Sequence, residues 1–348
     1  MNILGIETSC DETAAAIVRD GREVISNVVY TQIPLHQPYG GVVPEIASRA
    51  HIEKIGEVVR TAMTEKIDAV AVTYGPGLSP ALIVGLNAAK GLAKGLGVEL
   101  VGINHIEAHL HTPFLDSELK PEDFMPGLGL AISGGHTCLI DMPEYGRYEI
   151  IGQTLDDAAG EAFDKAAKLL GLGYPGGPKV DKISKAWLEK TGVEGRHGND
   201  LIPFPKGRPR DGVTALAGLP AELCVSFSGL KTALLRHVQK EPPTDDDIPR
   251  IVASYQEAIV QAVADRTRTA LRRGKYRSLI VGGGVSLNSR LRTVLAEVAA
   301  RERVELLMAK PKYCGDNGAM IAGLAWYRRN HVEDAMTLDV NPCLEVGQ

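Results

Sequence analysis

The chain has 348 residues, which accommodates two domains of ordinary size. Apolar residues make up 44% and charged residues 23%, a composition that excludes a disordered chain and favours a globular one. The formal net charge of -5 excludes an overall basic surface, so any contact with nucleic acid has to be local. No apolar run approaches the ~20 residues of a membrane span and no leader pattern precedes Thr8, so we expect no membrane association and a cytoplasmic location.

The amino-terminal pattern is strand, polar turn, strand, tight turn and strand. Strands are expected over 3–6, 14–18 and 23–29, with the polar turn at 7–13. A similar order returns with strands over 127–132, 138–141 and 148–153 and a polar turn at 133–137. An internal duplication is the economical interpretation, and two like domains commonly bind a nucleotide in the cleft between them. Two unrelated hairpins are the alternative.

The stretch between the repeats alternates helix and strand. After Gly40 and Gly41 a helix is expected to about residue 65, followed by a strand over 68–73, a helix over 81–95 and a strand over 98–103. This alternation favours a parallel or mixed sheet. We therefore predict one domain over 1–112, completed by a carboxyl-terminal helix over 317–345, a proline-rich crossing at 113–126, and a second domain over 127–316.

A histidine cluster follows the strand that ends at residue 103. Asn104 is a good helix N-cap and Pro113 a good stop, so a short helix is predicted between them. His105 and His109 are four residues apart, share one face and can hold one metal ion. Glu107 lies roughly 200° round the helix from His105, which disfavours the zinc-peptidase pattern H-E-x-x-H. Polar decoration of a surface helix is the alternative for the histidine pair.

The second half contains a predicted helix over 154–172, with Asp164 near its middle, and a further helix that Asp181 opens. Two basic patches are expected, in the loop 204–210 and on a helix over 265–277, and each fits contact with phosphates as well as a solvated surface. The segment 241–247 is an acidic connection.

The strand predicted over 278–281 runs into Gly282, Gly283 and Gly284, and a helix begins after Asn288. Three glycines at a strand-to-helix turn let a flat group approach the backbone, although neither the Rossmann nor the P-loop pattern is present. A later strand over 304–309 leads to Asp316, at an expected N-cap position. If Asp316 faces the two histidines, the set suits Fe(II) or Zn(II) with open positions.

Several motifs occur together in one order along the chain. They are 5–13 (GIETSCDET), the His105 and His109 pair, 132–137 (ISGGHT), 163–165 (FDK), 174–178 (YPGGP), 227–231 (FSGLK) and 315–318 (GDNG). Together they resemble the bacterial form of the TsaD family, the tRNA N6-adenosine threonylcarbamoyltransferases formerly labelled O-sialoglycoprotein endopeptidases. The resemblance covers nearly the whole chain. It implies an α/β fold of the actin/Hsp70/sugar-kinase-like (ASKHA) class, with two duplicated RNase H-like domains facing a nucleotide cleft.

The resemblance also implies an activity, which is transfer of threonylcarbamoyl from threonylcarbamoyl-AMP to the adenosine next to the anticodon. By motif, one divalent metal ion, Fe2+ in preference to Zn2+, would be held by His105, His109 and Asp316. The implied substrate-binding residues are Ile132, Ser133, Gly134, Gly135, His136, Asp164, Gly177, Asp181 and Asn288. His136 or Glu12 would take the proton from the amine, and ATP or ADP would fit the same cleft. The implied partners are tRNA, a TsaB-type paralogue and a TsaE-type P-loop ATPase.

Two other functions are compatible with parts of the sequence. A kinase-like or ATPase protein of the same superfamily would account for the glycine turns, but it leaves the metal set without a use. A non-catalytic scaffold, like the shortened paralogue of this family, would lack the metal set that this chain keeps. Both rank below the transferase.

Overall fold

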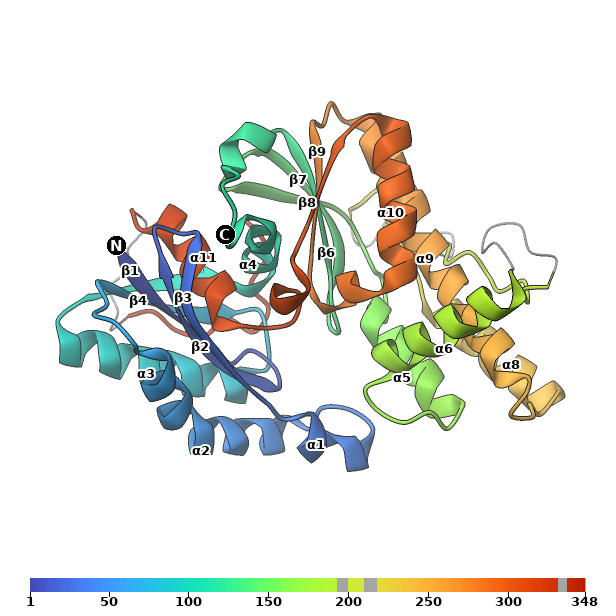
Figure 1. Cartoon of the computed structure of the whole chain (residues 1–348), viewed down its shortest axis with the longest axis horizontal. Coiled ribbons are helices and arrows are strands. Elements are labelled where there is room, and N and C mark those ends of the chain that lie inside the picture. The colour runs from blue at the N-terminus through green and yellow to red at the C-terminus, as the bar shows by residue number, and fades with distance from the viewer. Residues whose placement is uncertain (193–199, 210–217, 331–336, 348) are drawn as a thin grey trace.

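The computed structural model describes residues 1–192, 200–209, 218–330 and 337–347. The chain forms two lobes side by side, each built around a twisted five-stranded sheet (Figure 1). The first sheet has the order β3-β2-β1-β4-β5. Its strands are β1 (Asn2–Glu7), β2 (Glu12–Arg19), β3 (Glu23–Thr31), β4 (Ala69–Gly75) and β5 (Glu99–Asn104).

The second sheet repeats this topology. Its order is β10-β9-β6-β7-β8, formed by β6 (Gly127–Ile132), β7 (Thr137–Glu144), β8 (Arg147–Gln153), β9 (Ser278–Gly282) and β10 (Glu305–Met308). In each sheet the first three strands form an antiparallel meander, and the next strand pairs in parallel with the first of the three. The internal duplication predicted from the sequence is therefore confirmed.

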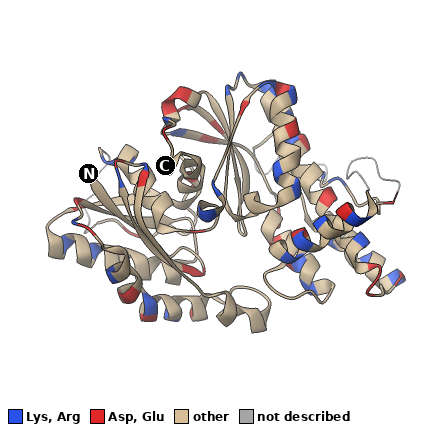
Figure 2. Ribbon diagram, in the orientation of Figure 1, with Lys and Arg blue, Asp and Glu red and all other residues tan. Residues whose placement is uncertain are grey.

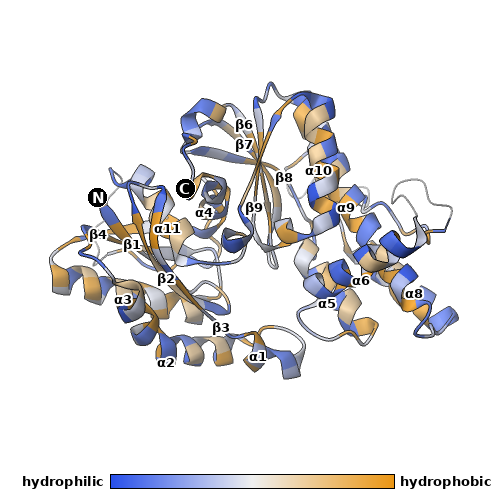
Figure 3. Ribbon diagram, in the orientation of Figure 1, coloured by the Kyte–Doolittle hydropathy of each residue, from blue (hydrophilic) through white to orange (hydrophobic). Residues whose placement is uncertain are grey.

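Both faces of the first sheet are covered by helices. Leu4 and Ile6 of β1 pack with α2 (Pro44–Ala62) and α3 (Ser79–Leu96), while Ile3 packs with α11 (Gly318–Arg328) on the opposite face. Successive side chains of a strand point to opposite faces, so a strand covered on both sides reads as a continuous apolar run. Figure 3 shows these strands as mostly hydrophobic. The short α1 (Ile33–His36) and η1 (Gln37–Tyr39) connect β3 to α2.

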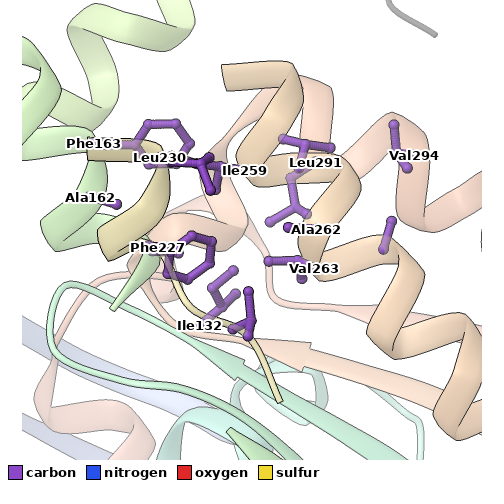
Figure 4. Close-up of a cluster of buried hydrophobic side chains, with 14 of the residues drawn as sticks. Ile132, Ala162, Phe163, Phe227, Leu230, Ile259, Ala262, Val263, Leu291 and Val294 are labelled. Carbon is purple, nitrogen blue, oxygen red and sulfur yellow. The ribbon is translucent and has the colours of Figure 1, made fainter. Parts of the chain in front are cut away.

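The second sheet carries a larger helical layer. It comprises α5 (Ala159–Leu169), α6 (Gly176–Thr191), η4 (Ala221–Leu223), α8 (Ser228–Lys240), α9 (Ile248–Arg273), η5 (Gly284–Leu287) and α10 (Ser289–Glu302). Figure 4 shows the core that joins them, in which Phe163, Phe227 and Leu230 pack beside Ile132, Ile259 and Leu291. This core fixes the α5–α6 connection relative to the end of β6.

Two connections join the lobes. The first runs from α4 (His105–His111) through η2 (Thr112–Phe114) and η3 (Pro121–Phe124) to β6, and the second from β10 through η6 (Pro311–Tyr313) to α11. Figure 1 shows α4 between the two sheets. A Cβ on Gly282, at the end of β9, would lie 2.0 Å from the carbonyl oxygen of His109, so glycine lets the helix and strand approach. The histidine helix is thus packed into the junction of the lobes.

Several predicted helix bounds are wrong. The helix expected over 154–172 spans Ala159–Leu169, and the helix that Asp181 was expected to open begins at Gly176. The basic stretch 265–277 contains only the end of α9, which begins at Ile248. The carboxyl-terminal helix expected over 317–345 ends at Arg328, and residues 337–347 are turns and irregular chain.

No described helix combines the length and the apolarity needed to cross a membrane. Lys and Arg are frequent on α5, α6 and α8 (Figure 2), whereas the central strands are nearly free of charge. The charged residues therefore lie mainly on the helices that cover the sheets, in both lobes.

Candidate metal and nucleotide site

The histidine helix begins where the sequence predicts. Asn104 Oδ1 accepts hydrogen bonds from the backbone N–H of Ile106 at 2.9 Å and of Glu107 at 3.3 Å, so Asn104 is the N-cap. His105 and His109 lie on the same face of α4, with ring centroids 4.7 Å apart. Both side chains are buried.

Asp316 approaches this pair from the second connection between the lobes. Its Oδ1 lies 3.1 Å from Nε2 of His109 and 3.7 Å from Nε2 of His105. Potential ligand atoms of the three residues all lie within 4.8 Å of one another. The prediction that Asp316 occupies an N-cap position is wrong, because Asn317 Oδ1 caps α11 by accepting from Met320 N at 3.1 Å. The Asp316 carboxylate is therefore left to the histidines.

Glu7, at the end of β1, has a role here that sequence reasoning missed. Its Oε2 lies 3.0 Å from Nδ1 of His105, and its side chain is fully buried. A carboxylate accepts, so Nδ1 of His105 donates to Glu7, and Nε2, on the side of Asp316, is the nitrogen available to a metal ion. The only signal in the sequence is a carboxylate at the end of an apolar strand.

The charges in this cluster favour a cation. Burial alone would lower the pKa of His105, but the Glu7 and Asp316 carboxylates outweigh it and raise that pKa to about 9. Burial likewise opposes ionisation of Asp316, yet His105 and His109 hold its pKa well below the ordinary range. Both shifts mean that positive charge between these side chains is stabilised. A divalent cation satisfies the same preference with ordinary ligands.

His109 provides a further observation. Both ring nitrogens are buried, and among the described residues Nδ1 has no hydrogen-bond partner, while the polar contact of Nε2 is the Asp316 carboxylate at 3.1 Å. Buried polar atoms without partners are rare in folded proteins and call for an explanation such as a bound ion. The residues present therefore fit a metal ion held by two imidazoles and one carboxylate.

The turn between β6 and β7 lies beside the metal cluster. Ser133 N donates to the His136 carbonyl at 2.8 Å, and His136 N donates to Ser133 Oγ at 3.2 Å. The His136 ring lies 6.3 Å from that of His105. Burial and the neighbouring His105 and His109 lower the pKa of His136 to about 4, so its imidazole is neutral at pH 7.

Glu12 stands at the start of β2, on the first lobe. Its Oε1 accepts a hydrogen bond from Thr31 Oγ1 at 3.3 Å. Burial, then the charges of Asp11 and Asp316, raise the pKa of Glu12 well above its ordinary value. A carboxyl group whose pKa is raised in this way is suited to exchanging protons.

A cavity of about 510 Å³ opens in the second lobe. Apolar walls are formed by Phe163, Pro175, Pro178, Val285 and Leu287, and of the predicted substrate-binding residues Gly134, Asp164, Gly177, Asp181 and Asn288 line it. Ile132, Ser133, Gly135 and His136 are not among the lining residues. The turn 133–136 thus presents Gly134 to the cavity and His136 to the metal cluster.

Three polar residues of the cavity are already bonded within the protein. Asp164 Oδ1 accepts from Gly176 N at 2.6 Å, and Asp181 Oδ1 accepts from Ser289 Oγ at 2.8 Å. Asn288 caps α10 by accepting from Leu291 N at 2.9 Å and donates to Gln256 Oε1 at 2.8 Å. A nucleoside that contacts Asp181 or Asn288 would therefore bind side chains that already form hydrogen bonds within the protein.

The predicted basic patch at the end of α9 is largely neutralised. Arg266 is buried and donates to the carbonyls of Cys224 and Gly207, so it is not a surface charge. Arg272 and Arg273 form ion pairs with Glu302 and Glu222. In the other predicted patch, the loop 204–210, Lys206 borders a hollow of about 1250 Å³. None of the predicted site residues lines this hollow. Arg210 lies outside the described residues.

Two sheets of the same β-meander topology, one after the other in the chain, are typical of the actin, Hsp70 and sugar-kinase class of folds. Two solved structures share it. HypF in its phosphate- and nucleotide-bound form has a TM-score of 0.57 and 12% identity, over 96% of this chain and 56% of that one. The (R)-2-hydroxyglutaryl-CoA dehydratase component A of Acidaminococcus fermentans has a TM-score of 0.52 and 14% identity, over 95% and 99%. At these identities the likeness concerns the fold alone.

The sequence comparisons are more specific. The model of the TsaD family, tRNA N6-adenosine threonylcarbamoyltransferase, matches residues 23–323. Proteins of that name from Clostridium perfringens and Clostridium botulinum are each 44% identical, over 99% and 100% of this chain and 98% of their own. The chain therefore belongs to the TsaD family and is a transferase.

Proposed function

We propose that the chain transfers the threonylcarbamoyl group of L-threonylcarbamoyladenylate to N6 of adenosine 37, next to the anticodon, in tRNAs reading A-starting codons, and releases AMP. One observation carries the proposal within this family. A single turn, 133–136, connects the cavity with the candidate metal ligands: Gly134 lines the cavity, and the His136 ring lies 6.3 Å from the ring of His105. A donor with its nucleoside in the cavity would bring its reactive end toward His136.

The reaction needs an activated donor because the N6 amine is a poor nucleophile. In the proposed step, N6 attacks the carbamoyl carbon, and the bond from that carbon to the phosphate oxygen breaks. AMP leaves with the electron pair, and the amine gives up a proton. Most of the catalytic task is to orient donor and amine and to stabilise the charge that develops on the leaving phosphate.

The chain offers groups for each part of this task. The backbone N–H groups of Gly134 and Gly135 make no hydrogen bond with described residues, so they are free to face developing negative charge. We assign the proton of the amine to His136, whose imidazole is neutral at pH 7, or to Glu12.

The metal ligands in this proposal are His105, His109 and Asp316, with Fe2+ favoured over Zn2+. When bound, the ion would supply positive charge to a phosphate oxygen as a Lewis acid. The open positions left by three protein ligands are what such a contact requires. The residues themselves contribute a rigid frame, since α4 is capped by Asn104 and wedged against Gly282.

The proposal includes partners and a location. The target adenosine has to leave the anticodon-loop stack to reach the site, as single-stranded RNA bases do on many proteins. We also propose that a TsaB-type paralogue and a TsaE-type ATPase assist the chain, and that the complex works in the cytoplasm.

The test is incorporation of radiolabelled threonine into tRNA by the purified chain, alone and with both partners. Bicarbonate, ATP and the enzyme that makes the adenylate are supplied, and His109→Ala is compared with wild type. Incorporation that requires His109 would support transfer and the metal set together. Absence of incorporation with all partners present, alongside phosphoryl transfer to a small molecule, would overturn the proposal in favour of a kinase.

A further inference from the structure

Glu107 is a buried carboxylate of α4 that does not belong to the set His105, His109 and Asp316. It lies roughly 200° round the helix from His105, and only 2% of it is exposed. Carboxylates are buried in proteins only where partners compensate for the lost water. Its partners therefore show what the side chain does.

Glu107 holds α4 to two other segments. Its Oε2 accepts from Arg328 Nη2 at 2.6 Å, and its Oε1 accepts from Gly347 N at 2.8 Å. Arg328 is the last residue of α11, the helix that begins two residues after Asp316. We call residues 313–328, which contain Asp316 and α11, the Asp316 segment. The ion pair thus ties the far end of this segment to the helix that carries the histidines.

The last described residues complete this attachment. Asn104 Nδ2 donates to the Glu345 carbonyl at 2.9 Å, while its Oδ1 caps α4. Val346 packs in one apolar cluster with Ile106 and Leu110 of α4. Figure 1 shows this end of the chain beside α4. Residues 345–347 therefore brace the helix from the side that does not carry the metal ligands.

A second carboxylate holds the near end of the Asp316 segment. Asp116 follows α4 and η2 on the first connection, and its Oδ2 accepts from Tyr313 Oη at 2.6 Å and pairs with Lys312 Nζ at 2.7 Å. Tyr313 precedes Asp316 by three residues. Asp116 Oδ1 also accepts from Val24 N at 3.0 Å, which anchors it to the first sheet.

We infer that Glu107 and Asp116 are positioning residues that set the separation of Asp316 from His105 and His109, and through it the affinity for a divalent cation. Asp316 lies on a segment clamped at Tyr313 and at Arg328, and both clamps lead back to the stretch that carries the histidines. Neither carboxylate is close enough in this arrangement to serve as a ligand of the cluster. The inference rests on the metal part of the proposed function.

The experiment titrates Co2+ into the purified full-length chain and records its ligand-field absorption, without tRNA or donor. Glu107→Gln and Asp116→Asn are compared with wild type and with Glu118→Gln, an exposed carboxylate on the same connection. Residues that orient metal ligands typically change affinity by about 10- to 100-fold, so we expect a loss of at least 10-fold and an altered spectrum for both variants. The control should stay within about 2-fold of wild type.

Glu107→Gln removes the negative charge that pairs with the partly buried Arg328 and can lower the melting temperature, so titrations are done well below that temperature. Asp116→Asn changes a partly exposed group and keeps the test available if Glu107→Gln does not fold. Wild-type affinity and spectrum in a folded Asp116→Asn would overturn the inference, as would a wild-type chain that binds no Co2+. A chain that binds Co2+ with the expected ranking but transfers no threonylcarbamoyl refutes the proposed function alone.

Discussion

Glu7 and His105 form a buried carboxylate–imidazole pair that joins the end of β1 to the start of α4, 98 residues further along the chain. The same carboxylate accepts hydrogen bonds from Ser9 N and Thr73 Oγ1, each at 2.5 Å. Three partners fix its position, and it in turn fixes the orientation of the His105 ring. The ring is thereby held with Nδ1 toward Glu7 and Nε2 toward Asp316.

Replacing Glu7 by glutamine should weaken divalent-metal binding by about 10- to 100-fold, because the amide no longer stabilises one tautomer of His105. Isothermal titration with Zn2+ measures the change. Glu53→Gln, an exposed carboxylate on α2, serves as the control and should bind as wild type does. Undiminished affinity in a folded Glu7→Gln would show that the pair does not orient the ligand.

Gly282→Ala should disturb the histidine helix through the backbone. The added methyl group would lie 2.0 Å from the His109 carbonyl oxygen, so β9 and α4 have to separate. We expect a loss of stability on the order of 1–3 kcal/mol or more, together with weaker metal binding. Gly284→Ala is the matched control, since nothing lies within 4 Å of its added methyl group. The melting temperatures of both variants test this prediction. Equal melting temperatures would contradict the close packing of Gly282 against the His109 carbonyl.

His51 should make stability depend on pH. Its Nε2 lies 2.9 Å from the Cys10 carbonyl and its Nδ1 2.8 Å from Thr13 Oγ1, and burial lowers its pKa below the ordinary 6.5. The folded chain therefore binds fewer protons than the unfolded chain as pH falls through 6.5, so stability is lost on acidification. The loss from one such group is at most ~1.4 kcal/mol per pH unit.

Urea unfolding between about pH 7.5 and pH 5.5 measures this dependence, at a spacing that brackets the ordinary histidine pKa. His51→Gln should lose less stability than wild type over the interval, even if it is less stable at the higher pH. Parallel curves for the two proteins would rule out a buried neutral His51 as the cause.

The cavity rim should contribute to RNA binding if the chain acts on tRNA. Lys182 and Lys185 line the cavity, and neither forms an ion pair with a described residue. Changing both to glutamine should weaken tRNA binding and reduce the slope of log affinity against log salt by about 1.4 to 2. Filter binding at several salt concentrations measures the slope.

Arg272→Gln with Arg273→Gln is the matched control for charge, because both arginines are already paired with glutamates. The control should change the slope much less. A larger effect from the arginine pair would place the RNA on α9 instead of at the cavity.

The fold was accessible from the sequence because its signals are local. Strand, polar turn and strand recur with the same spacing, and the topology of the two sheets follows that repeat. The candidate metal ligands were accessible in part for the same reason. His105 and His109 share a helix face that Asn104 begins, and both features are readable within a few residues.

The remaining features depend on contacts across long stretches of chain. Arg266 looks like a surface charge in sequence, but carbonyls at positions 207 and 224 bury it. The start of α6 has two glycines, which disfavour a helix. The helix nevertheless begins there, because Gly176 N donates to Asp164 Oδ1 and the close packing excludes a side chain: a Cβ on Gly176 would lie 2.7 Å from the Cβ of Ala167. Glu7 falls within the motif 5–13, but its role cannot be inferred from the sequence, since its partner His105 is 98 residues away.

The cavity has a consequence for how ligand binding couples to motion. All its lining residues, from Gly134 to Lys185 and from Gly284 to Asn288, belong to the second lobe. A nucleoside bound there would contact only the second lobe, so its affinity would be the same whatever the angle between the lobes. Its binding alone would therefore not change that angle. Only a ligand extending past the turn 133–136, toward side chains of the first lobe such as Glu12, can couple binding to closure. If the lobes move, filling the cavity and closing the lobes would therefore be separable steps, and the end of the ligand nearest the first lobe would control the second step.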